Sequence, residues 1–174
     1  MSPIVHAELS WLLAQTLRER RDRILVTCAG LAPDLDGLGL LGGRELYERY
    51  HHVLFHGYVG ALVTVLVCAA LARARSRVVL LSLLAFHLHL LCDLAGSGPG
   101  WPILYFWPTS RAEWFWEGQW NLASWQNAVI ALAATLMALS CALLRWRRTP
   151  VELVSPRWDA EVVHTLRRRF LREA

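Results

Sequence analysis

Three apolar segments constrain the fold of this chain more than any other feature. They cover residues 53–72, 78–94 and 127–144. Each approaches the roughly 20 residues that a helix needs to cross about 30 Å of hydrocarbon, although His87 and His89 interrupt the second, which is the shortest. Because 55% of the 174 residues are hydrophobic, the sequence predicts an all-α, multi-pass membrane helical bundle.

Shorter elements complete this expected bundle at both ends. Residues 4–17 and 24–32 are too short to cross a membrane alone, so we expect half-buried helices packed on the others. The N-terminus has neither a basic leader nor a small-residue cleavage site, so we expect no cleaved signal peptide. Near the C-terminus, Ser155 and Pro156 are helix-start signals. The segment after them has one apolar face, formed by Trp158, Val162, Leu166 and Phe170, and arginines elsewhere. We predict a membrane-embedded domain over residues 1–149 and a cytoplasmic amphipathic, basic tail over residues 150–174, lying on the anionic leaflet.

The basic residues predict the topology. All 18 are arginines, and three groups of them lie in the turns at residues 18–23, 73–77 and 145–148. Basic residues near span ends stay preferentially in the cytoplasm, so one up-and-down path places these turns inside. The net charge of +4 can reflect topology, anionic partners or a biased genome composition, and we expect no nucleic-acid partner. The predicted location is the inner (cytoplasmic) membrane.

Histidines and aspartates gather at the opposite, outward-facing ends of the segments. His89 and Asp93 are four residues apart and share a helix face, so they can bind one metal from successive turns. His87 points nearly the opposite way, which favours a packed or hydrogen-bonded role. Ionisable groups inside membrane segments are costly unless they are paired, metal-bound or functional.

Two further motifs supply candidate ligands. In "HHVLFHG", helical spacing favours His52 with His56, whereas His51 and His56 converge only if the helix begins after His51. In "PDLDG", Pro33 and Gly37 bracket an expected extended turn in which Asp34 and Asp36 project the same way. With His6, this mixture of imidazoles and carboxylates suits Zn²⁺, Mn²⁺ or Fe. The four cysteines lie apart in apolar runs, and we interpret them as core residues.

The order of these residues forms a pattern. The early His6 is followed by Pro-Asp-x-Asp at residues 33–36 and by a His-rich stretch at residues 51–57. His-x-x-x-Asp follows with His89 and Asp93, and then an aliphatic stretch with Trp-Pro, "PILYFWP", at residues 102–108. Over residues 4–108 the chain resembles the membrane-bound, metal-dependent hydrolases of the YdjM/YbcI type, also described as LexA-binding, inner-membrane-associated hydrolases. Departures are Gly37 where many members have His, His52 where they have Arg, Phe55 where they have Thr, and Gly57 where they have Ser.

The resemblance implies a ligand set. It favours His51 over His52, against the spacing argument, and gives as metal ligands His6, Asp34, Asp36, His51, His56, His89 and Asp93. Asp36 is the carboxylate that we expect to remain free as the general base. His52, His87 and Trp107 are expected to support the ligands or to contact the substrate.

The hypothesis for function is metal-dependent hydrolysis, with Zn or Mn as cofactor activating water. The tryptophan-rich stretch 101–125 is typical of an interfacial aromatic belt, and it can also form the wall of a site for an amphiphile. Membrane lipid and a small-molecule or lipid-like phosphoester are the expected partner and substrate. Two alternatives stay open: a non-catalytic metal-binding or structural membrane protein, and a b-type haem carrier, which the clustered aspartates disfavour.

Overall fold

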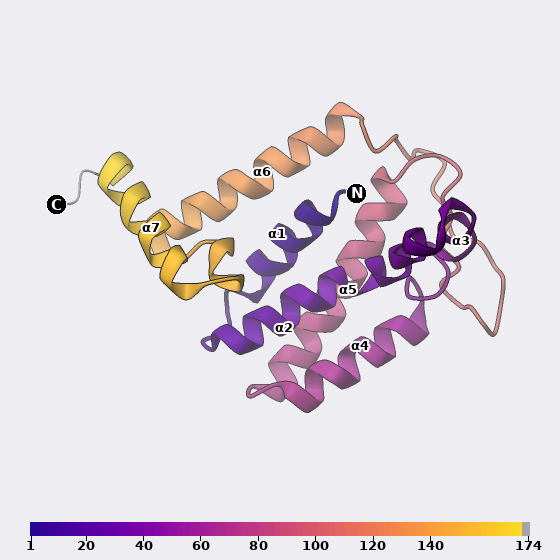
Figure 1. Ribbon diagram of the computed structural model, residues 1–174, viewed down its shortest axis with the longest axis horizontal. Coiled ribbons are helices and arrows are strands. Elements are labelled where there is room, and N and C mark those ends of the chain that lie inside the picture. Colours follow the sequence, from indigo (N-terminus) through magenta and orange to yellow (C-terminus); the bar gives the residue numbers. More distant parts are fainter. Residues whose placement is uncertain (172–174) are drawn as a thin grey trace.

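The chain folds into a bundle of helices, as predicted (Figure 1). The computed structural model describes residues 1–171, and its only extended pairing in that range is one antiparallel bridge between Ile103 and Trp114. The α-helices are α1 (Pro3–Ala14), α2 (Arg20–Leu31), α3 (Arg44–Tyr50), α4 (Tyr58–Leu71), α5 (Arg75–Gly96), α6 (Trp125–Cys141) and α7 (Pro156–Leu171). Three short helical pieces join them: η1 (Ala32–Gly42), η2 (Ala142–Trp146) and η3 (Pro150–Leu153).

Three helical stretches are long and apolar enough to cross a membrane: Arg20–Gly42, Arg75–Gly96 and Trp125–Trp146. The last two contain the predicted segments 78–94 and 127–144. The first corrects the prediction that residues 24–32 form an isolated short element, because the 3₁₀ helix η1 continues α2 without a break. Pro33 lies where the helix changes from α to 3₁₀, consistent with the backbone N–H that a proline lacks for a bond to the preceding turn.

The predicted span 53–72 is too long at its start. Helix α4 begins only at Tyr58, and residues 51–57 form turns and bends. The remaining 14-residue helix is apolar but short. The histidines before α4 therefore lie on irregular backbone and not on the helix itself.

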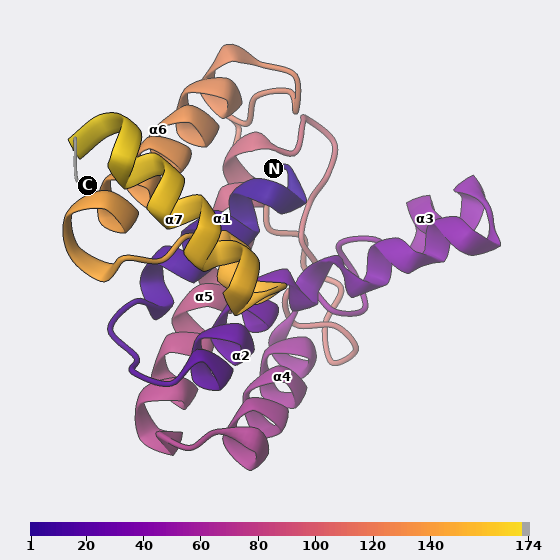
Figure 2. The ribbon, with the colours of Figure 1, turned by 60° about the vertical axis from the view of Figure 1, so that its left-hand side comes forward.

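Helix α5 lies at the centre of the bundle and packs against α1, α2 and α4 (Figures 1 and 2). Buried apolar side chains between these helices include Val26, Ala29, Val78 and Ala85. Helices α1 and α2 approach closely at Gly30, where an added Cβ would lie 1.8 Å from the Ser10 Oγ. The absence of a side chain at Gly30 thus allows α1 to reach the end of α5.

The three arginine-rich turns lie at one end of the bundle. The Arg73 guanidinium contacts the Glu19 carboxylate at 3.1 Å, which joins the first two turns. The Arg148 Nε donates to Gln15 Oε1 at 2.7 Å, which brings the third turn to the same end. The predicted clustering of basic charge on one side is therefore present in the fold.

The C-terminal tail begins as predicted. Helix α7 starts at Pro156, and the Trp158 amide donates to the Ser155 Oγ at 3.3 Å. Trp158 and Phe170 are each 63% exposed on it. The last three residues of the predicted tail, 172–174, lie outside the described residues. Upstream of α7, Glu152 binds Arg23 and accepts a hydrogen bond from Trp11, which fixes η3 to the arginine-rich end.

Candidate metal centre

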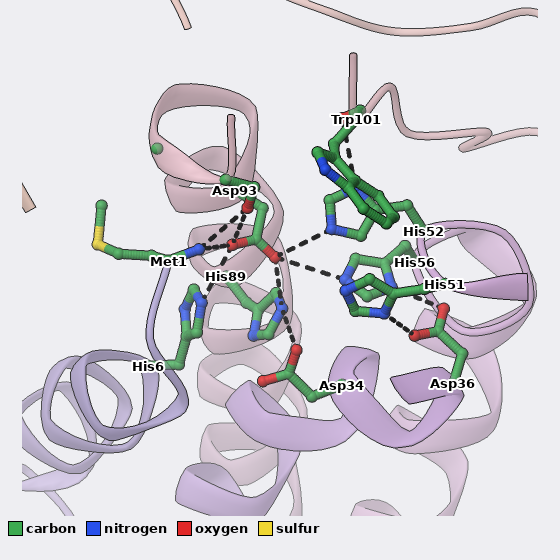
Figure 3. A network of polar contacts seen from close by, with 12 residues as sticks. Met1, His6, Asp34, Asp36, His51, His52, His56, His89, Asp93 and Trp101 are labelled. Carbon is green, nitrogen blue, oxygen red and sulfur yellow. Dashed lines mark hydrogen bonds and ion pairs between the residues drawn. The ribbon is translucent and has the colours of Figure 1, made fainter. Parts of the chain in front are cut away.

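Four ligand-type side chains converge where η1, the turn before α4 and the last turns of α5 meet (Figure 3). One donor atom from each of Asp34, His56, His89 and Asp93 lies within 4.8 Å of the others. The His89 Nε2 lies 2.9 Å from Asp93 Oδ2, as the four-residue spacing on α5 predicts. The same carboxylate oxygen lies 3.4 Å from His56 Nε2, and Asp34 Oδ1 lies 3.6 Å from His89 Nε2.

Several of these donors are buried without a hydrogen-bond partner. Among the described residues, the Nε2 atoms of His56 and His89 and the Oδ2 of Asp34 make no hydrogen bond, and both imidazoles are at most 1% exposed. The short contacts to Asp93 have ion-pair distances but not hydrogen-bond geometry. A buried polar atom left unsatisfied costs about 1–3 kcal/mol. A divalent cation among these atoms would satisfy all of them, so the donor set fits a metal.

The other ring nitrogen of each histidine is held by an oxygen that can only accept. His89 Nδ1 lies 2.7 Å from the Gly30 carbonyl, and His56 Nδ1 lies 2.8 Å from Asp36 Oδ2. Because these oxygens only accept, Nδ1 must carry the hydrogen, and the neutral ring then directs the lone pair of Nε2 at the cluster. This is the orientation that metal-binding histidines require.

Asp36 occupies a different position from the one expected. Its side chain is fully buried, and its two oxygens accept from the Nδ1 atoms of His51 and His56 at 2.7 and 2.8 Å. The expected extended turn is a 3₁₀ helix, with about three residues per turn, so residues two apart point in different directions. Asp34 therefore faces the cluster, while Asp36 lies behind the histidines, where its geometry favours orienting them rather than accepting a proton from substrate water.

His6 reaches the cluster from α1. Its Nε2 lies 3.2 Å from Asp93 Oδ1, and its ring stacks on His89 with 3.7 Å between centroids. The Ser97 Oγ donates to the same Asp93 oxygen at 2.8 Å, and the Met1 amino group also contacts it. The two oxygens of Asp93 thus face two separate groups of partners.

His51 and His52 lie on the turn after α3, so the helical-spacing argument for His52 does not apply. His51 is bound to Asp36, as described above. His52 has a left-handed backbone, with φ of 66°, and its Nδ1 lies 3.3 Å from the Trp101 carbonyl. Its Nε2 lies 3.8 Å from Asp93 Oδ2, so His52 faces the cluster as well.

Charge is unevenly distributed over the histidine-rich turn. Burial lowers the pKa of His52 to about 3, and the neighbouring His56 adds to this effect, so His52 is neutral at pH 7. Burial alone would also lower the pKa of His56, but bonding to the carboxylates of Asp36 and Asp93 outweighs it and raises the pKa to about 9. A metal that binds His56 must therefore displace a proton.

A pocket of about 490 Å³ opens beside the cluster. Asp34, His51, His52 and Asp93 lie in its polar part, and Tyr47, Trp101 and Leu122 form its aromatic and apolar walls. A second pocket, of about 380 Å³, shares His51 and Trp101 with it. Trp101 belongs to the tryptophan-rich stretch that was predicted as a possible wall of the site, whereas Tyr47 was not predicted, because only tertiary structure distinguishes it from the other aromatic residues.

His87 and Trp107 lie away from these pockets. His87 Nε2 lies 2.9 Å from the Tyr105 hydroxyl and its Nδ1 lies 2.9 Å from the Leu83 carbonyl, consistent with the hydrogen-bonded role that spacing indicated. In the described part of the chain, no hydrogen bond or ion pair joins Trp107 to the clustered side chains. Trp101, rather than Trp107, is the tryptophan at the site.

Comparison with known proteins agrees with the pattern of histidines and aspartates. A family model described as YdjM inner membrane protein matches residues 1–156, which include every clustered residue. No curated protein and no solved structure matches the chain. The predicted resemblance and the predicted inner-membrane location are both confirmed. The chain belongs to the YdjM family of inner membrane proteins.

Proposed function

We propose that this protein is a metal-dependent hydrolase. The observation that carries the proposal is the convergence of Asp34, His56, His89 and Asp93, with unpartnered buried donor atoms, beside an open pocket. A purely structural metal site is normally closed by four protein ligands, whereas a catalytic one keeps a position for water or substrate. The adjoining pocket supports the catalytic alternative.

A bound divalent metal would supply Lewis acidity, which lowers the pKa of water and polarises the scissile group. The chain's own residues supply the rest. His89 and Asp93 would hold the metal from consecutive turns of α5, and the Gly30 carbonyl and Asp36 fix the imidazole orientations. Asp34 is 27% exposed at its side chain and lines the pocket, so it is the carboxylate placed to accept a proton from water.

The proposed substrate is an amphiphile with a phosphoester head group. The pocket combines a polar floor with Tyr47, Trp101 and Leu122, and exposed aromatic side chains follow on the same loop at Trp114, Phe115 and Trp116. Aromatic residues of this kind favour the membrane interface. A head group can thus reach the metal while its chains stay in lipid.

A turnover assay on detergent-purified protein tests this proposal. Metal-loaded protein should release product from short-chain phospholipid or related phosphoester substrates, and a chelator should abolish release until metal is restored. Asp93→Asn should remove turnover, whereas His87→Asn should retain it, because within residues 1–171 the hydrogen bonds of the His87 ring go to Tyr105 and Leu83 and not to the cluster. Turnover that survives both chelation and Asp93→Asn would refute the proposal.

A further inference from the structure

A second group of donors lies next to the first. One ring nitrogen from each of His51, His52 and His56 lies within 4.8 Å of the others. The ring centroids are 4.5 Å apart for His51 and His52, and 4.3 Å apart for His52 and His56. Figure 3 shows these three rings gathered on one side of Asp93, with His6 on the other and His89 between them.

All three imidazoles are held in the same way. The Nδ1 atoms of His51 and His56 are bound to Asp36, and the Nδ1 of His52 is directed at the Trp101 carbonyl. Each acceptor requires a hydrogen on Nδ1, so the lone pair is left on Nε2 in each neutral ring. Each imidazole therefore turns Nε2 away from its acceptor and can present it to a metal, and His56 would release a proton on binding one.

The backbone of His52 is the second observation. Its φ of 66° lies in the left-handed region, which only a few per cent of residues other than glycine adopt, histidine more often than most. The side chain is nevertheless 2% exposed and faces Asp93 Oδ2. Strained backbone of this kind is retained where the position of a side chain matters.

Asp93 lies between the two groups. Its Oδ1 faces His6, while its Oδ2 faces His89, His56 and His52 at 2.9, 3.4 and 3.8 Å. A carboxylate can bridge two metal ions that lie about 3.5–4 Å apart, the separation found in two-metal hydrolytic sites. Asp93 Oδ2 lies within 4 Å of imidazoles from both groups, which makes Asp93 the candidate bridge between them.

We propose that this protein binds two divalent metal ions, the second held by His51, His52 and His56, with Asp93 bridging it to the first. His56 lies within reach of both groups of donors, so it would serve the second ion, while Asp34, His89 and Asp93 would hold the first. This inference rests on the proposed metal centre and deepens it, because a substrate phosphate would be held between two cations at the pocket floor.

Counting bound metal tests the inference. Full-length protein in detergent is loaded with Mn²⁺, freed of excess metal by gel filtration and measured by elemental mass spectrometry. Wild-type protein should hold two equivalents and show a spin-coupled Mn²⁺ resonance. His52→Asn should hold one equivalent with an uncoupled signal, because asparagine tolerates the left-handed backbone but replaces the imidazole. His51→Gln should behave likewise, and His87→Asn should retain two equivalents.

The outcomes separate the inference from the proposed function. One equivalent in active wild-type protein would overturn the second site and leave the hydrolase proposal standing. Two equivalents retained in both His52→Asn and His51→Gln would also overturn it. Wild-type protein that elutes as a folded species without metal would overturn both proposals together.

Discussion

At the scale of single residues, Asp36 controls the direction of two imidazoles. Asp36→Asn keeps the size of this buried side chain but replaces one acceptor oxygen with an NH₂ donor. Either His51 or His56 must then move its hydrogen to Nε2 and lose the lone pair that faces the cluster. Removing such a supporting carboxylate typically weakens metal binding by about 10–100-fold.

Competition with a chelator measures this change in the metal dissociation constant. Glu48→Gln is the matched control, since Glu48 is an exposed carboxylate that pairs with Arg44 and not with a histidine. An Asp36→Asn protein with the wild-type dissociation constant would contradict the orienting role.

Sequence spacing identified the residues of the site better than their roles. His89 and Asp93 were predictable because α-helical geometry alone brings positions four apart together. The roles of Asp36 and His52 were not, because one depends on a 3₁₀ helix and the other on a left-handed turn. Trp101 enters the site only through the path of the loop that follows α5.

At the scale of elements, the close contact of α1 and α2 places His6 and His89 together. Gly30→Ala would place a methyl group 1.8 Å from Ser10 Oγ and force the helices apart. Overpacking of this kind costs about 1–3 kcal/mol, and the Gly30 carbonyl would shift away from His89 Nδ1. We expect a lower thermal unfolding temperature in detergent and weaker metal binding.

The compensating change serves as the control for this prediction. Ser10→Gly removes both side-chain atoms that the new methyl group would meet. The Ser10→Gly/Gly30→Ala protein should therefore recover much of the lost thermal stability. A single Gly30→Ala protein as stable as wild type would show that the two helices do not need this contact.

The hydrophobic runs predicted the presence of the helices more accurately than the residues at which the helices begin and end. The segments 78–94 and 127–144 were recognisable because long apolar runs without charges have few alternatives to a spanning helix. The continuation of α2 into η1 was not predicted, because Pro33 and the nearby glycines are typical of a turn. The start of α4 was predicted too early, because the turn before it has histidines and Phe55 at spacings that resemble those of an apolar helix.

At the scale of the whole molecule, the two ends of the bundle differ in charge and chemistry. The arginine-rich turns share one end, and the histidine and aspartate cluster lies at the other. The distribution of basic residues predicts that the arginine-rich end lies in the cytoplasm. We therefore expect the pocket to open on the outer side of the inner membrane.

Cysteine labelling can test this orientation with a matched pair of serines. Ser110 lies on the tryptophan-rich loop and Ser76 lies near the start of α5, and both are exposed. In a background without the native cysteines, a membrane-impermeant maleimide applied to the outer side should label Ser110→Cys and leave Ser76→Cys unlabelled until the membrane is opened. The reverse pattern would place the site in the cytoplasm.

The central claim is that histidine and carboxylate side chains bind a metal at the outer end of the bundle. X-ray absorption spectroscopy of the metal in detergent-purified protein tests it most directly. For zinc, we predict nitrogen and oxygen ligands at about 2.0–2.2 Å, with outer-shell scattering from imidazole and no sulfur. Sulfur ligation, which would involve one of Cys28, Cys68, Cys92 or Cys141, or a folded protein that binds no metal, would contradict the account.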